Sequence, residues 1–127
     1  MILDTSFLID LLRGEESVEE VTDISASSTF FVTPVSVMEL YEGVCLAASA
    51  GERREVERLL DGLRELEFTN AAAKRAGEVN AELHEDGQPI DVEDVMIAAV
   101  ALENDESVVT RNTDHFDRIE GLETVTY

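Results

Sequence analysis

Short apolar segments alternate with helical patterns along this chain, and that alternation constrains the fold more than any other feature. The strand-like segments are residues 1–3, 29–33, a piece of 65–68, 108–110 and 124–125. Between them, apolar residues recur at helical spacing, for example at Val56, Leu59, Leu60 and Leu63. Strands that alternate with helices predict a largely parallel sheet with helices on both of its faces.

The expected helices cover about residues 7–12, 15–24, 34–48, 52–63, 70–85 and 92–103. Thr33 and Pro34 suit the cap and the first position of the third helix, and Thr5 or Ser6 can cap the first helix. The run 95–102 is apolar on every side, which is typical of a buried helix. Residues 111–117 are expected to form a loop.

Size and composition suit one packed domain covering residues 1–127. The chain has 127 residues, of which 44% are hydrophobic, and it contains no apolar run approaching the ~20 residues that span a bilayer. The first strand begins at Met1 without a basic leader, so we expect no N-terminal extension and a cytoplasmic location. Cys45 has apolar neighbours and no evident partner, and we expect a buried structural thiol there.

The charge balance is strongly acidic, with 29 acids against 9 Lys and Arg residues and a formal net charge of −20. The acids are dispersed over helix-like segments rather than gathered in a tail, which indicates solvated faces. Such a surface repels itself at low salt and is screened at high salt, so we expect a salt-loving source. The competing interpretation is a surface that mimics nucleic acid or binds a basic partner.

Several acids stand where strands end or helices begin. Asp4 follows the first buried strand, and the carboxyl ends of parallel strands are where ligands bind in open sheets. Glu39 lies in the first turns of the helix after the second strand, and Asp91 and Asp94 begin the buried helix. Each could simply cap a helix or stabilise its dipole. That alternative is favoured for Asp91 and is weaker for Asp94, whose helical neighbours are apolar.

The loop of residues 110–116 completes the set of candidates, because it again follows a buried strand. Acids that converge at several strand ends either shift their pKa values or hold a cation, and oxygen ligands suit Mg²⁺ or Mn²⁺. His84 and His115 are unaccompanied in the sequence, so we interpret both as surface or local hydrogen-bonding residues.

Four motifs in this order resemble the PIN-domain nucleases, and in particular the small VapC-type toxins of toxin–antitoxin pairs. They are residues 2–6 (ILDTS), 35–40 (VSVMEL), 94–99 (DVMIAA) and 109–112 (VTRN), the last followed by Phe116 and by Gly121-Leu122. The resemblance covers nearly the whole chain. It implies a three-layer α/β/α sandwich around a mainly parallel sheet of four or five strands, and cleavage of RNA with Mg²⁺ or Mn²⁺.

The resemblance also implies roles for individual residues. Asp4, Glu39 and Asp94 match the three core acids of the family, as catalytic residues and metal ligands. A cation on Asp4 and Asp94 would polarise the phosphate, and Glu39 would ligate through water or accept a proton.

Other positions match the family pattern less fully. Thr5 or Ser6 matches the hydroxyl beside the first acid, and Arg111 could bind a phosphate or form a surface ion pair. The family often has a fourth acid where this chain has Asn112, so Asn112 or Asp114 could fill that position. Asp91 is a further candidate ligand.

The resemblance implies an antitoxin partner that sends an Arg or Lys toward the acids, and possible homodimers. Alternatives remain open. A PIN nuclease could process RNA without being a toxin, and a degenerate PIN fold could be a non-catalytic acidic module that binds protein. An aspartyl-phosphate phosphatase would want a second Asp where Ser6 stands, and a phospho-receiver domain would want a matching Lys, for which Lys74 is badly placed.

Overall fold

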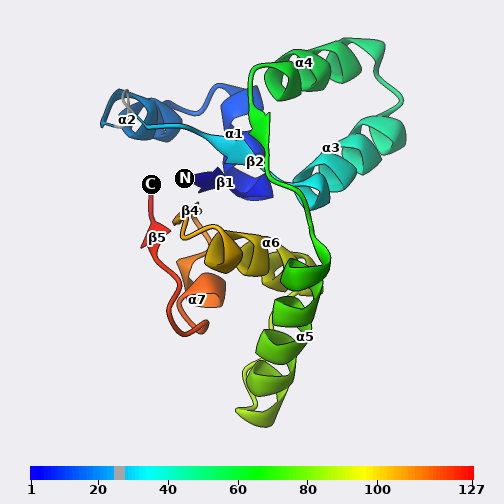
Figure 1. Cartoon of the computed structure of the whole chain (residues 1–127). Helices are drawn as coiled ribbons and strands as arrows, with labels where there is room; N and C mark the ends of the chain where they lie inside the picture. The colour runs from blue at the N-terminus through cyan, green and yellow to red at the C-terminus, as the bar shows by residue number, and fades with distance from the viewer. Residues whose placement is uncertain (25–27) are drawn as a thin grey trace.

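A five-stranded parallel sheet forms the centre of the molecule. The computed structural model describes residues 1–24 and 28–127. The strands are β1 (Ile2–Leu3), β2 (Phe31–Val32), β3 (Arg64–Glu65), β4 (Val108–Val109) and β5 (Thr124–Val125). Their order is β3-β2-β1-β4-β5, and every neighbouring pair is parallel (Figure 1). The predicted parallel sheet is therefore confirmed.

Helices separate these strands in the sequence. They are α1 (Thr5–Arg13), α2 (Glu16–Ile24), α3 (Pro34–Ala47), α4 (Ala50–Asp61), α5 (Asn70–Glu85), α6 (Val92–Glu103) and α7 (Thr113–Phe116). The bounds of α5 and α6 coincide with those expected from the sequence. In the described part of the chain, none of these helices has the length and apolar character needed to cross a membrane.

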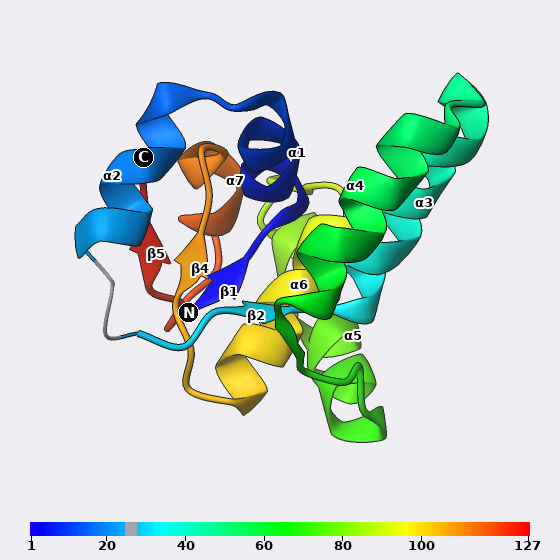
Figure 2. The same cartoon turned by 90° about the horizontal axis from the view of Figure 1, so that it is seen from above.

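The alternation of side chains along β1, β2 and β4 builds one core on each face of the sheet. Ile2 and Val108 belong to a cluster with the apolar residues of α5, α6 and α7. Leu3 and Val109, one position further along the same strands, belong to a second cluster with α1, α2, α3 and α4. Helices thus cover both faces, as the two views in Figures 1 and 2 show, and the fold is the expected α/β/α sandwich.

The helix starts agree with the sequence prediction at α3 and differ from it at α1. Thr33 caps α3 through a hydrogen bond from the Ser36 N–H, with Pro34 at the first position, as predicted. The first helix is capped by Asp4, not by Thr5 or Ser6, and the Asp4 carboxylate accepts from the Phe7 N–H at 2.9 Å. A carboxylate at this position also suits the partial positive charge of the helix N-terminus.

The expected loop at 111–117 contains the short helix α7, so that expectation was wrong in part. The Asn112 carbonyl accepts hydrogen bonds from the N–H groups of His115 and Phe116, which forms the first turn. Phe116 is fully buried and anchors this turn in the core. Four residues are too few to show a helical period in the sequence, and the turn is stabilised by that anchor.

Cys45 is exposed, which contradicts the prediction of a buried thiol. Its neighbour Val44 faces the core at 5% exposure, and the next residue along α3 is rotated away by about 100°. Leu46 follows at 81% exposure, so this end of α3 projects beyond the core. The apolar residues around Cys45 in the sequence therefore do not indicate that its side chain is buried.

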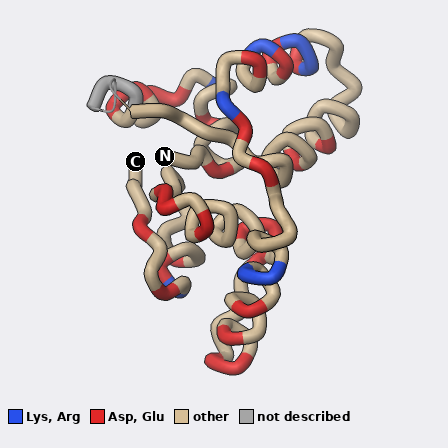
Figure 3. The backbone as a smooth tube through the Cα atoms, in the orientation of Figure 1, with Lys and Arg blue, Asp and Glu red and all other residues tan. Residues whose placement is uncertain are grey.

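The order of the strands in the sheet reverses direction at β1. From β1 the chain continues to β2 on one side, whereas β4 pairs with β1 on the other. Ligands bind in open α/β sheets at such a topological switch point, outside the carboxyl ends of the strands. Asp4 follows β1 and Thr110 follows β4, so both lie at this position. Elsewhere the acids are distributed over most helices (Figure 3).

Two glycines with open space around them give a test of the backbone assignments. Gly77 lies within α5, and Gly14 ends α1 with φ +70°. A Cβ at either position would meet no other part of the structure within 4 Å. We expect Gly77→Ala to raise the free energy of unfolding by about 0.5–1 kcal/mol, because glycine loses more backbone entropy in a helix. We expect Gly14→Ala to lower it by about 1–2 kcal/mol, because alanine disfavours the left-handed region.

Denaturant unfolding of both variants at constant salt measures these changes. Equal effects of the two substitutions would contradict the placement of Gly14 at the left-handed end of α1.

Candidate active site

Asp4 lies at the carboxyl end of the central strand and is 2% exposed. Its two carboxylate oxygens lie 2.8 and 2.9 Å from the Ser6 hydroxyl, which donates to them, and Oδ1 also accepts from the Phe7 N–H. These donors are neutral, so they orient the carboxylate without cancelling its charge. Burial raises the pKa of Asp4 above its ordinary 3.8, hydrogen bonds such as that of Thr110 lower it, and the charge of Asp94 raises it.

Glu39 projects from the second turn of α3 toward the start of α1. The Thr5 hydroxyl donates to its Oε1 at 2.7 Å and lies 3.0 Å from the Ser36 hydroxyl. Burial raises the pKa of Glu39 above its ordinary 4.5, and the charges of Asp94, Glu93 and Asp4 raise it further, whereas the Thr5 bond lowers it. The pKa of Glu39 therefore depends on the charges of both other core acids.

Asp94 lies in the first turn of α6 and is half-buried. Its Oδ2 is 3.0 Å from Nδ1 of His115, which comes from α7 at the carboxyl side of β4. Burial raises the pKa of Asp94, and the hydrogen bond from His115 lowers it. Sequence reasoning had set His115 aside as a surface or local residue. The signal that could have identified it is its place five residues after Thr110, in the loop already singled out.

Asp91 occupies the cap position of α6, as expected, but its side chain makes no capping hydrogen bond. In the described part of the chain, one ligand atom each from Asp91, Asp94 and His115 lie within 4.8 Å of one another. Carboxylate oxygens are the donors that Mg²⁺ and Mn²⁺ prefer. Asp4 and Glu39 are not part of this group, although the charge of Asp94 raises the pKa of both. The carboxylates of Asp91 and Asp94 suit a hard divalent cation, and the His115 nitrogen is the third possible ligand atom.

Asn112 and Asp114 are both exposed. Asn112 precedes α7, and its backbone N–H donates to the Thr110 hydroxyl at 2.9 Å. Asp114 lies in the first turn of α7 and is not part of the group formed by Asp91, Asp94 and His115. Both residues therefore lie at the exposed rim of the acidic site. Glu93 is a half-buried acid that the sequence analysis had not included.

Arg111 makes an ion pair instead of standing free. Its Nη1 donates to both carboxylate oxygens of Asp10, at 3.0 and 2.9 Å. The Tyr127 hydroxyl donates to the same carboxylate at 2.7 Å and also contacts the Ser6 hydroxyl. Burial raises the pKa of the Tyr127 phenol above its ordinary 10.0, and the bond to Asp10 raises it further.

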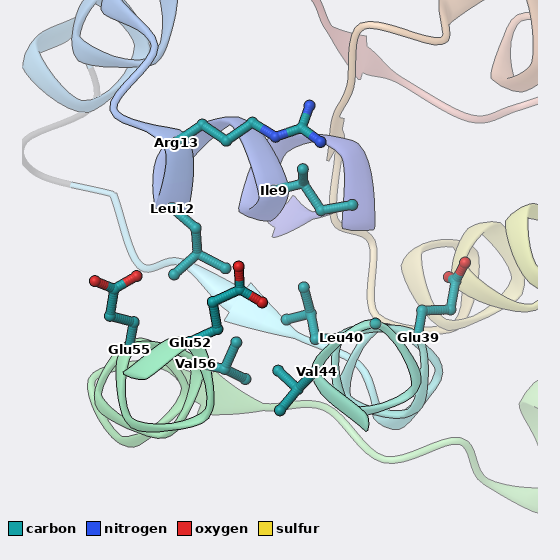
Figure 4. A pocket seen from close by; sticks show the side chains of 10 residues that line it. Ile9, Leu12, Arg13, Glu39, Leu40, Val44, Glu52, Glu55 and Val56 are labelled. Atoms are coloured by element: carbon teal, nitrogen blue, oxygen red, sulfur yellow. The ribbon is translucent and has the colours of Figure 1, made fainter. Parts of the chain in front are cut away.

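A groove of about 270 Å³ runs between α1, α3 and α4 (Figure 4). Its apolar surface is formed by Ile9, Leu12, Leu40, Val44 and Val56. Acidic and basic side chains flank this surface; they are Glu39, Glu52, Glu55 and Arg13. Because Glu39 is one of them, the groove adjoins the acidic site.

Comparison with known proteins identifies the family. The sequence matches the PIN domain over residues 1–122. It is 31% identical over 126 residues to the tRNA(fMet)-specific endonuclease VapC of Shigella flexneri, covering 97% of this chain and 94% of that protein. It is 32% identical over 123 residues to ribonuclease VapC10 of Mycobacterium tuberculosis, covering 96% and 90%.

Solved structures show the same architecture. DNA-bound VapBC from Salmonella typhimurium has a TM-score of 0.85 at 29% identity, covering 98% of this chain and 96% of that chain. VapBC2 from Rickettsia felis, bound to a promoter DNA fragment, has a TM-score of 0.88 at 23% identity, covering 99% and 97%, and shows the shared fold alone. The resemblance carried by the four motifs is confirmed, and this protein belongs to the PIN-domain family.

Proposed function

We propose that this protein is the ribonuclease of a toxin–antitoxin pair and hydrolyses RNA phosphodiester bonds with the help of Mg²⁺ or Mn²⁺. The observation that carries the proposal is the arrangement of Asp4, Glu39 and Asp94 around the switch point of the sheet, where the charge of Asp94 raises the pKa of both Asp4 and Glu39. The relatives named ribonuclease and tRNA endonuclease support the same activity. On this proposal residues 1–127 act as a single nuclease domain.

Asp4 and Asp94 would hold the divalent cation, with Glu39 as a further ligand directly or through water. A bound divalent cation lowers the pKa of a water molecule and polarises the scissile phosphate. His115 orients Asp94 through their 3.0 Å contact, as outer residues commonly orient metal ligands. Asp91 is within reach of Asp94 and supplements this ligand set.

The hydroxyls of Thr5 and Ser6 orient the acids in this proposal. Ser6 orients Asp4, and Thr5 holds one oxygen of Glu39, leaving its other oxygen for a ligand or a proton. The raised pKa of Glu39 makes it a better proton acceptor than an ordinary glutamate, as general-base catalysis requires. Asn112 and Asp114 on the rim are candidates for contacts to a water or to the RNA.

The groove between α1, α3 and α4 is the surface on which we place the antitoxin. Its apolar surface with flanking acids suits an amphipathic segment that carries Arg or Lys. A guanidinium or ammonium group at the Glu39 end would approach the core acids and compete with the cation there. The solved VapBC complexes support an antitoxin partner.

A PIN nuclease that processes RNA without a toxin role is the second candidate, and a homodimer is compatible with either. We also infer that the enzyme works in the cytoplasm and that its acidic surface is an adaptation to high salt. Ion pairs such as Arg75–Glu103 exist, but 9 bases cannot pair 29 acids.

The core acids can be tested by Asp4→Asn, since asparagine retains an oxygen that can cap α1. We expect cleavage of RNA to fall by at least about 100-fold, because the cation that would polarise the scissile phosphate loses one of its carboxylate ligands. Without divalent metal at pH 7 the variant should be the more stable protein. Because the pKa of Asp4 is raised in the folded state, the ionised carboxylate lowers the free energy of unfolding of the parent. The stability difference between variant and parent should therefore shrink as the pH falls toward 3.8 and Asp4 becomes protonated.

Cleavage rates with and without EDTA, together with thermal unfolding from pH 4 to 8, measure these effects. Mg²⁺ or Mn²⁺ should raise the unfolding temperature of the parent and much less that of Asp4→Asn. Asp86→Asn, at the exposed end of α5, is the control and should behave as the parent. Full activity of Asp4→Asn would refute the assignment of the site.

The groove can be tested by filling it at Gly43. A Cβ at Gly43 meets nothing within 4 Å, so Gly43→Met should be folded and should project into the groove. We expect it to weaken binding of the co-expressed antitoxin by at least about 10-fold, because the side chain occupies space that the partner needs. RNA cleavage should change little. Gly77→Met on α5 is the matched control, with equally open surroundings.

Titration calorimetry with the product of the neighbouring gene gives the affinities. Equal affinities for the two methionine variants would place the partner elsewhere.

The acidic surface predicts an unusual response to salt. At about 1 M ionic strength the Debye length falls to ~3 Å, so repulsion among surface acids and between protein and RNA is screened. We expect both the unfolding temperature and the initial cleavage rate to rise from dilute buffer to about 1 M KCl, with divalent metal kept saturating. A rate that falls steadily while the protein stays folded would favour the interpretation that the surface binds a basic partner.

A further inference from the structure

Asp10 is a buried carboxylate that the proposed chemistry does not use. It is 3% exposed and lies on α1, two turns from the Asp4 cap. A buried charge is costly unless it is paired and hydrogen-bonded. Asp10 satisfies this requirement through Arg111, 101 residues away, and through Tyr127, 117 residues away. Two distant parts of the chain are thus brought to one carboxylate.

The ion pair is asymmetric in its exposure. The Asp10 side chain is 4% exposed, whereas the Arg111 side chain is 51% exposed. Both hydrogen bonds to Asp10 start from Nη1 of Arg111. A guanidinium carries five N–H donors, so donors remain for a ligand on its exposed side. Arg111 is therefore a cation held in place by Asp10 but still accessible to solvent, unlike an arginine in a buried salt bridge.

The anchored guanidinium is connected to the core acids through the residue that precedes it in the chain. Arg111 directly follows Thr110, whose side chain hydrogen-bonds Asp4. Asp10 is six residues beyond Asp4 along α1, a rise of about 9 Å, and side chains of a helix lean toward its N-terminus. Arg111 is thus connected to Asp4 through its chain neighbour Thr110, and its own side chain binds Asp10 further along α1.

Tyr127 fixes this arrangement from the other side. Its ring meets Phe7 edge-on with centroids 4.9 Å apart, and its hydroxyl donates to Asp10. Phe7 is fully buried, so the phenol is held against a rigid part of α1. An arginine whose partner is held in this way loses little freedom when it binds a ligand.

We propose that Asp10 and Tyr127 are positioning residues that hold Arg111 as the anchor for an RNA phosphate neighbouring the scissile one. This inference rests on the proposed ribonuclease function. In a chain of net charge −20, general attraction to RNA is absent, so a fixed cation beside the acids supplies contact that the surface does not. The ligand is single-stranded RNA, recognised at its backbone.

Arg111→Met tests the anchor, because methionine keeps much of the side-chain volume and removes the charge. We expect KM for a short single-stranded RNA to rise about 10- to 100-fold, as for a lost charge-assisted hydrogen bond, with kcat within about twofold. The slope of log Kd against log[KCl] should change by about 0.7, which corresponds to one phosphate contact.

Two further variants separate positioning from charge. Arg111→Lys keeps the charge but loses the planar fork that Asp10 holds, so the salt slope should persist while KM rises in part. Tyr127→Phe removes only the hydroxyl, and we expect a severalfold rise in KM with an unchanged salt slope. Arg75→Met is the matched control, since Arg75 pairs with Glu103 at 3.0 Å and is 43% exposed, away from the site.

The measurements are steady-state cleavage, thermal unfolding, and fluorescence anisotropy of a labelled single-stranded RNA without divalent metal. Arg111→Met that matches Arg75→Met in KM and salt slope would overturn the inference, as would a rise in KM fully explained by unfolding. A parent that binds RNA without cleaving it refutes the nuclease activity, and the anisotropy slopes then decide the anchor separately. A parent that neither cleaves RNA with divalent metal nor binds it in the anisotropy measurement overturns both.

Discussion

Mutual repulsion of the acids at the carboxyl edge of the sheet is the constraint on which the site depends. Asp4 is buried, and Glu39 and Asp94 are half-buried beside it. The orientation of Asp4 and Glu39 comes from neutral donors, chiefly the hydroxyls of Ser6 and Thr5. Such donors fix the geometry while leaving the negative potential in place. The carboxylates at this edge therefore favour binding of a cation, and their repulsion lowers the stability of the fold when no cation is bound.

The same conflict recurs at the scale of the whole molecule. Acids are spread over the helices (Figure 3). These acids repel one another, and they also repel the phosphates of the proposed RNA substrate. High salt removes the long-range part of this repulsion, whereas contacts within a few Å survive screening. A cation held at Asp4 and Asp94 and a guanidinium held on Asp10 are both contacts of this short-range kind. Specific, fixed positive charge thus replaces the diffuse basic surface that RNA-binding proteins commonly use.

Local signals predicted much of the fold. The bounds of α5 and α6 follow from their composition and from the break at residues 86–91 between them, and the prediction was accurate there. The prediction was wrong at Cys45, where apolar neighbours in the sequence concealed an outward-facing position at the free end of α3. It also missed α7, because four residues carry no readable period. In each case the deciding factor was packing against residues distant in the chain.

By itself, the sequence determined the alternation of strands and helices and the acids that end the strands, because periodicity and capping act over a few residues. It also determined the family, through four motifs in order. Only the tertiary structure decided which polar groups meet. His115 reaches Asp94 across 21 residues, and Arg111 reaches Asp10 across 101. Those meetings depend on the strand order β3-β2-β1-β4-β5, which arises from the burial of two apolar faces and leaves no local mark on the chain.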